Sequence, residues 1–185
     1  MKLSISIMLH PDRMQYLGYL IARLGTVPVA IDQGLGRWDT ARRAWELHDQ
    51  SSEYHLVVQD DALVCSCFRD KAEALLDDPR VATSFYYGRR RNLRAEARRG
   101  MKEGRVVADR LRWGVAICLP TALIPEMLEY ADRLEIPNTD TRVSRFIQAR
   151  GMRVVYPLPS LIDHRAGPSL IGDSEGRRAY LFEGE

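Results

Sequence analysis

Alternating apolar and polar residues predict that the chain begins with a β-strand over residues 2–9. In that segment leucine and isoleucine at odd positions alternate with serine, which is the spacing of a half-buried strand. Apolar residues then recur every three or four positions over 13–24, which predicts a helix that ends at Gly25. A short apolar run at 27–31 predicts a second strand. The chain therefore opens as a βαβ unit, which favours a parallel sheet with ligand sites at the carboxyl ends of its strands.

The remaining elements follow from the same patterns. We expect helices and strands in turn, with helices over 38–48, 68–76, 121–132 and 141–150, and strands over 54–58, 81–87, 113–119 and 154–156. The sequence shows no internal repeat and no linker between two halves. It therefore predicts an α/β protein with one domain over residues 1–172, built on a mostly parallel central sheet flanked by helices. Residues 173–185 are predicted to form a charged C-terminal tail.

Residues 88–112, here called the basic segment, interrupt this regular pattern. Ten of its side chains are positive, namely Arg89, Arg90, Arg91, Arg94, Arg98, Arg99, Lys102, Arg105, Arg110 and Arg112. Its apolar content is low, so it is either a mobile loop or a helix in solvent. Clustered arginines attract phosphate backbones, and the neighbouring Trp113 is suited to stack on an exposed base. The alternative is a charged surface helix that binds no ligand.

The overall composition is that of an ordinary globular protein. The chain has 185 residues, of which 45% are hydrophobic and 28% charged, and its net charge of +2 names no partner. This composition excludes a disordered or collagen-like chain. The three cysteines are too few for a disulfide framework and wrongly spaced for structural zinc, so we expect a reducing compartment. Without a long apolar run or a secretory signal, we expect a cytoplasmic protein.

The sharpest chemical feature is an acidic pair at the end of a predicted strand. Asp60 and Asp61 follow the apolar residues of the strand at 54–58 after a single glutamine. Buried carboxylates need a partner, because an unpaired buried charge is strongly destabilising. Magnesium or manganese, which bind carboxylate and phosphate oxygens, are possible partners. The alternative is that the two aspartates cap a turn or the next helix.

Several segments, the acidic pair among them, resemble nucleotide-sugar glycosyltransferases of the GT-A fold. The segment 57–61 resembles the acidic DxD-like motif of that family, and 113–128 resembles the strand and helix near its acceptor site. The segment 138–142 resembles its acceptor-side acidic motif, and 156–165 with 168–170 resembles its C-terminal histidine segment. These pieces follow one another in order and resemble the small transferases encoded by bacteriophages. The resemblance implies a GT-A-like, Rossmann-like fold and sugar transfer from a nucleotide diphosphate to an acceptor hydroxyl.

The resemblance also implies roles for particular residues. A divalent cation, manganese or magnesium, would be held by Asp61 and His164. The donor, a UDP-linked sugar, would be bound by His10, Arg13, Asp32 and Asp60. Gln59 departs from the family motif, since a strict DxD has an acid at this position, and this leaves the metal dependence open. Without the resemblance, Arg13 is a solvated helix residue, Asp32 a turn residue, and His164 a surface histidine in a segment that is neither helix nor strand.

Asp140 is implied as the catalytic base that takes the proton of the acceptor hydroxyl in an inverting enzyme. The same residue is suited to cap the helix predicted at 141–150, and a retaining enzyme would not need such a base.

The basic segment makes modified DNA the favoured acceptor. A 5-hydroxymethylpyrimidine such as hydroxymethylcytosine, which marks bacteriophage DNA modification, would be flipped out of the duplex. It would be contacted by Arg89, Arg90, Arg91, Arg94, Arg98, Arg99 and Trp113. A saccharide, lipid-linked or protein acceptor fits the resemblance equally well. From other classes, a non-catalytic nucleic-acid-binding protein and a nucleotidyltransferase remain open as alternatives.

Overall fold

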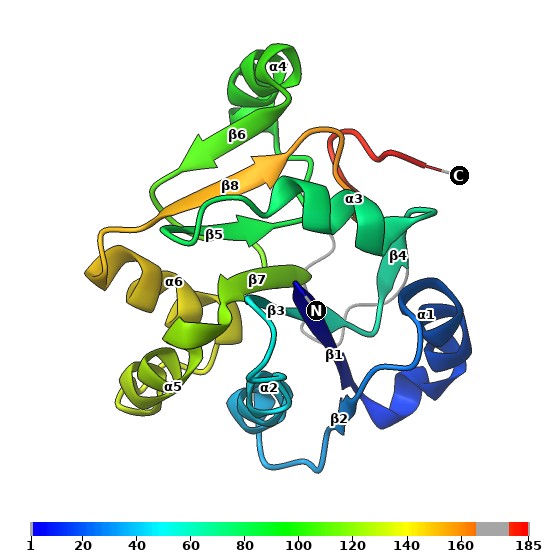
Figure 1. Cartoon of the computed structure of the whole chain (residues 1–185), viewed down its shortest axis with the longest axis vertical. Helices are drawn as coiled ribbons and strands as arrows, with labels where there is room; N and C mark the ends of the chain where they lie inside the picture. Colours follow the sequence, from blue (N-terminus) through cyan, green and yellow to red (C-terminus); the bar gives the residue numbers. More distant parts are fainter. Residues whose placement is uncertain (1, 166–177, 185) are drawn as a thin grey trace.

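The computed structural model describes residues 2–165 and 178–184 of the chain (Figure 1). Its strands are β1 (Leu3–Leu9), β2 (Val29–Ile31), β3 (Tyr54–Gln59), β4 (Ala62–Val64), β5 (Val81–Ser84), β6 (Arg105–Ala108), β7 (Ala116–Pro120), β8 (Arg153–Pro157) and β9 (Ile162–His164). Its α-helices are α1 (Leu17–Leu24), α2 (Arg37–Glu46), α3 (Phe68–Leu75), α4 (Arg94–Glu103), α5 (Ile124–Asp132) and α6 (Thr139–Ala149). Short 3₁₀ helices are η1 (Pro11–Tyr16), η2 (Arg91–Leu93) and η3 (Thr121–Leu123).

Seven strands form a central sheet in the order β2-β1-β3-β7-β5-β8-β6. The strands β2, β1 and β3 are parallel to one another, and β5 is parallel to β8. In contrast, β7 runs antiparallel to both β3 and β5, and the edge strand β6 runs antiparallel to β8. The helices α2, α5 and α6 lie on one side of the sheet, and α1 and α3 lie on the other (Figure 1). The predicted α/β class, with a mostly parallel sheet flanked by helices, is confirmed.

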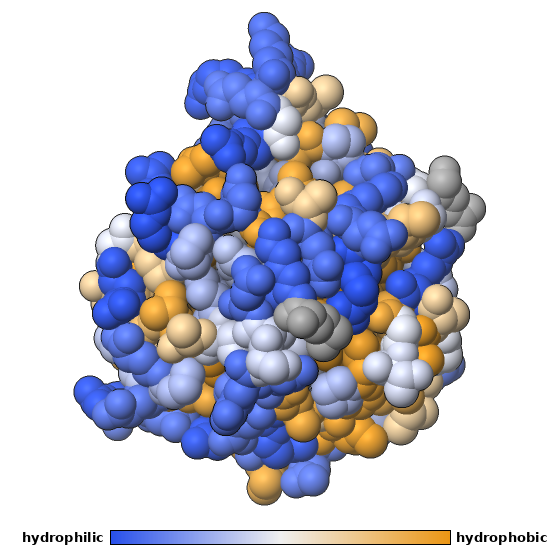
Figure 2. Space-filling view, viewed as in Figure 1, coloured by the Kyte–Doolittle hydropathy of each residue, from blue (hydrophilic) through white to orange (hydrophobic). Residues whose placement is uncertain are grey.

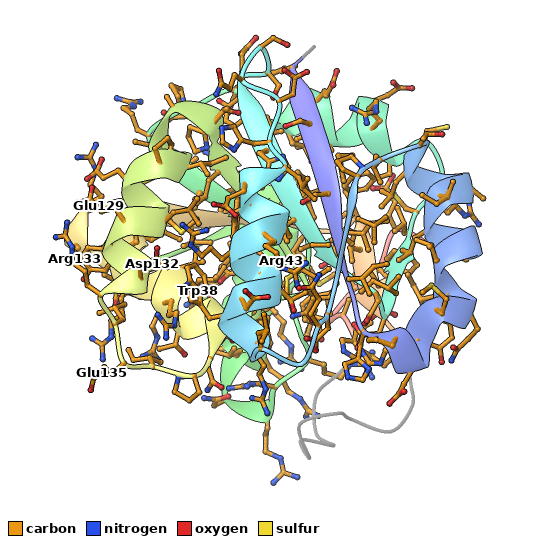
Figure 3. All side chains as sticks on the ribbon, turned by 90° about the horizontal axis from the view of Figure 1, so that it is seen from below. Trp38, Arg43, Glu129, Asp132, Arg133 and Glu135 are labelled. Atoms are coloured by element: carbon orange, nitrogen blue, oxygen red, sulfur yellow. The ribbon has the colours of Figure 1, made fainter. Side chains whose placement is uncertain are left out.

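The helices on the α2 side are joined by polar contacts. Seen from below, Trp38 of α2 points toward Asp132 of α5 (Figure 3), and its indole N–H donates a hydrogen bond of 2.8 Å to that carboxylate. Arg42 donates a second hydrogen bond of 3.1 Å to Asp132. The guanidinium of Arg142, from α6, stacks 5.1 Å from the centroid of the Trp38 ring. Trp38 therefore packs between helices.

The predicted elements all form, with ends shifted by a few residues, but the basic segment differs from its prediction. It folds into η2, α4 and the edge strand β6, and is therefore neither a loop nor one helix. Only Val106 and Ala108 of β6 are buried, which is too short a pattern to predict a strand. The helix α4 approaches β6 at Gly100, where an added Cβ would overlap the Val106 side chain.

The expectation that His164 lies outside any helix or strand is wrong. His164 ends β9, which pairs antiparallel with β4 in a separate two-stranded sheet. Each of these strands has three residues, so neither leaves a periodic pattern in the sequence.

The predicted C-terminal tail is described only from residue 178 to residue 184. Within this range Ala179 is buried, and the Tyr180 N–H donates a hydrogen bond of 2.8 Å to the Tyr87 carbonyl. Residues 168–170 of the resemblance lie outside the described residues. Among the described helices, none combines the length and the apolar character needed to cross a membrane.

A buried polar network lies in the core between β1, β3 and α2. His55 has no exposed surface, and its two ring nitrogens lie 2.8 Å from the Ser4 hydroxyl and 3.1 Å from the Ser6 hydroxyl. The Ser6 hydroxyl in turn donates a hydrogen bond of 2.8 Å to the Ala44 carbonyl. Burial lowers the pKa of His55 to about 4, because the charged ring would lose its hydration. His55 is therefore neutral in the folded protein at neutral pH.

This network predicts a loss of stability in mild acid. The unfolded chain binds a proton on His55 below about pH 6.5, whereas the folded chain resists protonation down to about pH 4. The contribution of neutral His55 to the free energy of unfolding is therefore fully present above about pH 6.5 and is lost as the pH is lowered. We expect the free energy of unfolding to fall by about 2 kcal/mol between pH 7 and pH 5. Urea unfolding at both pH values measures this loss. The His55→Asn variant serves as the comparison and should lack this component; an unchanged difference would contradict the assignment.

Candidate functional site

The acidic pair lies in the turn between β3 and β4, and Arg13 of η1 bridges it. Asp60 and Asp61 are each only 5% exposed. The Arg13 Nη1 group donates a hydrogen bond of 2.8 Å to Asp60 Oδ1 and a second, very short one to Asp61 Oδ2. The backbone N–H of His10 donates a hydrogen bond of 2.7 Å to Asp60 Oδ2. One guanidinium and one main-chain donor therefore join the segment after β1 to the end of β3.

His164 contacts the same pair from the other side. Its Nε2 lies 3.2 Å from Asp61 Oδ2, and its Nδ1 lies 2.7 Å from the Arg165 carbonyl. Since a carbonyl only accepts, Nδ1 carries a proton and Nε2 is the nitrogen that faces Asp61. The pairing of Ala62 with His164 across β4 and β9 brings this side chain to the doublet.

The two carboxylates differ in their surroundings, and their pKa values shift in opposite directions. Burial raises the pKa of Asp60 above its ordinary value, and its hydrogen bonds to His10 and Arg13 only partly oppose this. Burial acts in the same sense on Asp61, but the hydrogen bond and charge of His164, together with the charge of Arg13, outweigh it. These interactions hold the pKa of Asp61 below its ordinary value, so Asp61 is the more firmly ionised of the two.

The residues around Asp61 fit a divalent cation whose coordination is completed by a ligand. Asp61 Oδ1 is buried and has no hydrogen-bond partner among the described residues, so a lone pair is available there. With Nδ1 bound to a carbonyl, His164 would offer the Nε2 lone pair to a metal once the Nε2 proton that faces Asp61 is released. The described residues contain no group of three or more His, Cys, Asp or Glu side chains arranged to hold a metal. A cation would therefore take its other ligands from phosphate oxygens and water.

The two remaining donor-side residues lie beside this centre. His10 Nε2 lies 3.9 Å from Asp32 Oδ2. The other oxygen, Asp32 Oδ1, accepts hydrogen bonds from the Gly34 N–H at 2.9 Å and the Thr40 hydroxyl at 3.1 Å. Gly34 has a φ of 76°, which permits the tight turn that brings its N–H to the carboxylate. The structure therefore brings together His10, Arg13, Asp32, Asp60, Asp61 and His164.

Asp140 reaches the same edge of the sheet because β7 runs antiparallel to its neighbours. Gly114, just before β7, lies so close to β3 and α6 that an added Cβ would stand 3.2 Å from Gln59 Nε2 and 3.3 Å from Asp140 Cβ. Asp140 Oδ1 accepts a hydrogen bond of 2.8 Å from the Thr141 N–H in the first turn of α6. Asp140 therefore stands next to Gln59, the residue that precedes the acidic pair. Gly114 was not singled out from the sequence, and Gln59 was noted only as a departure from the family motif, because the importance of both lies in this close approach.

The basic segment begins beside this edge and extends away from it. Its predicted acceptor arginines, at positions 89, 90, 91, 94, 98 and 99, are all exposed. Arg90 lies 5.7 Å from the centroid of the Trp113 ring, and Trp113, which is 9% exposed, packs edge-on against Tyr86 and Tyr87. Figure 2 shows hydrophilic side chains covering the end of the molecule formed by α4. Arg90 and Trp113 thus lie near the site, whereas α4 packs on the edge strand β6.

No family model and no curated protein matches the sequence. Among solved structures, the chain is similar to a mutant of Drosophila β-1,4-galactosyltransferase 7 in complex with manganese, UDP-Gal and xylobiose. The TM-score is 0.50 and the identity 9%, over 97% of this chain and 76% of that one. At this identity the likeness shows the fold alone, which is a single-domain GT-A-like α/β fold as predicted.

The bridging role of Arg13 predicts a large effect on stability. In Arg13→Met the two buried carboxylates lose their shared cation, so we expect the free energy of unfolding to fall by about 3–5 kcal/mol at pH 7. Urea denaturation measures the change. The matched control is Arg42→Met, whose ion pairs with Glu46 and Asp132 are exposed and should contribute less than about 1 kcal/mol. Equal losses in the two variants would show that Arg13 is not the counter-ion of the doublet.

Proposed function

We propose that the chain is a glycosyltransferase that moves a sugar from a nucleotide diphosphate, with UDP as the favoured nucleotide, to an acceptor hydroxyl. The observation that carries the proposal is the convergence of Arg13, His164 and the doublet Asp60–Asp61 at the carboxyl end of β3. Support comes from the GT-A-like fold, which is similar to that of an enzyme solved with manganese and UDP-Gal. The carboxyl edge of a parallel sheet is where such folds bind ligands.

Donor binding is divided between the acidic pair and the residues after β1 and β2. Asp61 and His164 would hold manganese or magnesium, which when bound acts as a Lewis acid toward the diphosphate oxygens. Asp60, held by the His10 N–H and Arg13, faces the ribose or the sugar. Asp32, fixed by Thr40, offers its Oδ2 to a hydroxyl or base N–H of the nucleoside.

Asp140 is the base of the proposed reaction. It takes the proton of the acceptor hydroxyl as that oxygen bonds to the anomeric carbon of the sugar. The bond from the anomeric carbon to the diphosphate oxygen breaks, and its electron pair leaves with the nucleoside diphosphate. The transition state has oxocarbenium character, so a carboxylate beside the acceptor also stabilises the developing positive charge.

Modified DNA is the acceptor that the basic segment favours. None of the six exposed arginines named above forms an ion pair with a described carboxylate, so their charge is available to a polyanion. The substrate would be a 5-hydroxymethylpyrimidine, the base that small bacteriophage transferases of this kind decorate, and such an enzyme would work in the cytoplasm. Saccharide, lipid-linked and protein acceptors remain the alternatives, and the assay below distinguishes them.

The first test is sugar transfer itself. The protein is incubated with UDP-hexoses, manganese and DNA that contains hydroxymethylcytosine, beside unmodified DNA, and mass spectrometry reads the digested nucleosides. We expect a hexose-sized mass gain on the modified base alone, falling steeply as salt rises. Asp61→Asn should abolish the gain, whereas Asp78→Asn, at an exposed ion pair with Arg80, should leave it intact.

Two other results would revise the proposal in different ways. Release of UDP without a DNA product would retain the transferase and point to a saccharide, lipid-linked or protein acceptor. Binding of DNA without release of UDP from any donor would favour a non-catalytic nucleic-acid-binding protein.

The role of Asp140 has a separate test. Asp140→Asn keeps the size of the side chain but removes its basicity, so we expect kcat to fall by about 10²–10⁴-fold with little change in the donor KM. Initial rates at saturating donor measure this effect. Asp39→Asn, at the start of α2 and paired with Arg43, is the control for a lost carboxylate near a helix N-terminus. A kcat within a few-fold of the parent enzyme would leave helix capping as the role of Asp140.

A further inference from the structure

Arg165 is held in position by two tyrosine rings and by hydrogen bonds to Asp61 and His164. Its guanidinium carbon lies 4.6 Å from the centroid of the Tyr16 ring and 4.5 Å from that of Tyr19. Its backbone N–H donates a hydrogen bond of 2.8 Å to the Asp61 carbonyl. Its own carbonyl lies 2.7 Å from Nδ1 of His164. Its main chain is therefore joined to the backbone of Asp61 and to the side chain of His164, the two residues that would hold the metal.

Among the described residues, the guanidinium of Arg165 has no acceptor for its hydrogen bonds. None of its five N–H donors is bonded to any of the described residues, and its Nε is buried. Nor does a described carboxylate lie within ion-pair distance of it. The two tyrosine rings attract the cation through its faces, whereas the N–H donors lie in the guanidinium plane and stay unused. A buried N–H without a partner is destabilising, so such groups mark places where a ligand completes the structure.

The chemistry of that ligand follows from the charges nearby. The carboxylate of Asp163, two residues earlier in the chain, is paired with Arg178, and those of Asp60 and Asp61 are already bound by Arg13 and His164. A planar guanidinium whose position is fixed in advance loses little entropy when it binds, and it matches a phosphate group through two parallel hydrogen bonds. Tyr16 also follows Arg13 by three residues in η1, which keeps Arg165 beside the segment that contacts the doublet.

We infer that Arg165 binds the diphosphate of the nucleotide sugar and stabilises the negative charge that develops on it as the sugar leaves. This inference rests on the proposed function, because the diphosphate is that of the donor. It adds to that function an arginine that takes phosphate oxygens without using the metal. The alternative, here called the clamp, is a purely structural role in which Arg165 holds the end of β9 against η1 and α1 through its contacts with Tyr16 and Tyr19.

Calorimetry with UMP and UDP, at fixed manganese and without any acceptor, separates these two roles. If Arg165 binds the diphosphate, Arg165→Gln should weaken UDP binding by about 10- to 100-fold. It should weaken UMP binding much less, because UMP lacks the second phosphate. Arg165→Lys keeps the charge and the tyrosine contact but lacks the planar fork, so it should show a smaller loss of the same kind. The control is Arg23→Gln, which removes the other guanidinium near Tyr19, 5.7 Å from the ring centroid, and should leave both affinities unchanged.

Each remaining outcome counts against a specific statement. Equal weakening of UMP and UDP, with a lowered melting temperature, would overturn the inference in favour of the clamp, and so would unchanged UDP binding in Arg165→Gln. If the parent protein binds neither nucleotide, the proposed function fails and the role of Arg165 fails with it. Binding of UDP by the parent therefore separates an error about Arg165 from an error about the enzyme.

Discussion

Two adjacent carboxylates buried at the end of a central strand are the constraint on which the rest of the site depends. The strand β3 lies inside the sheet, so Asp60 and Asp61 emerge among packed side chains rather than in solvent. Their negative charge has to be balanced by groups held in fixed positions, because the surroundings cannot supply water to do so. Arg13 provides one balancing charge from the first connection of the chain, and His164 contacts the pair from a strand near its other end. The positions of η1 and β9 therefore depend on the doublet.

The reversal of β7 gives the site its second half. A wholly parallel sheet would bring only the ends of strands to this edge, whereas β7 brings its beginning, with Gly114 and the preceding Trp113. This arrangement places the first turn of α6, and so Asp140, beside Gln59. It also brings Arg90 next to the site through its stacking on Trp113. A proposed base and a basic surface thus meet the donor-side residues at one edge.

The sequence predicted an element, or the place of the acidic pair at a strand end, correctly wherever the residue pattern of one continuous segment was enough to define it. The alternation in β1, the apolar run of β3 and the helical spacing of α1 and α2 each reflect burial on one face, and the acidic pair could be located from the strand before it. The partners of that pair could not be derived from local pattern, because Arg13 and Asp60 are 47 residues apart and His164 lies farther still. The strands β4 and β9 are too short for a period to appear, and their pairing joins distant parts of the chain. Arg165 was missed for a related reason: its two tyrosines lie in η1 and α1, and nothing near position 165 indicates them.

The spacing of these partners along the chain has a consequence for the order in which the protein can mature on the ribosome. Synthesis from the N-terminus delivers Arg13 first, the doublet some fifty residues later, and His164 only after a further hundred. Arg13, β1, β3 and the doublet all precede β4 in the chain, so both partners of this ion pair are synthesised before β7. His164 is synthesised after both partners of that ion pair. The arginine contact of the doublet therefore depends on residues that are made early, whereas its histidine contact depends on β9, the last of the described strands to be made.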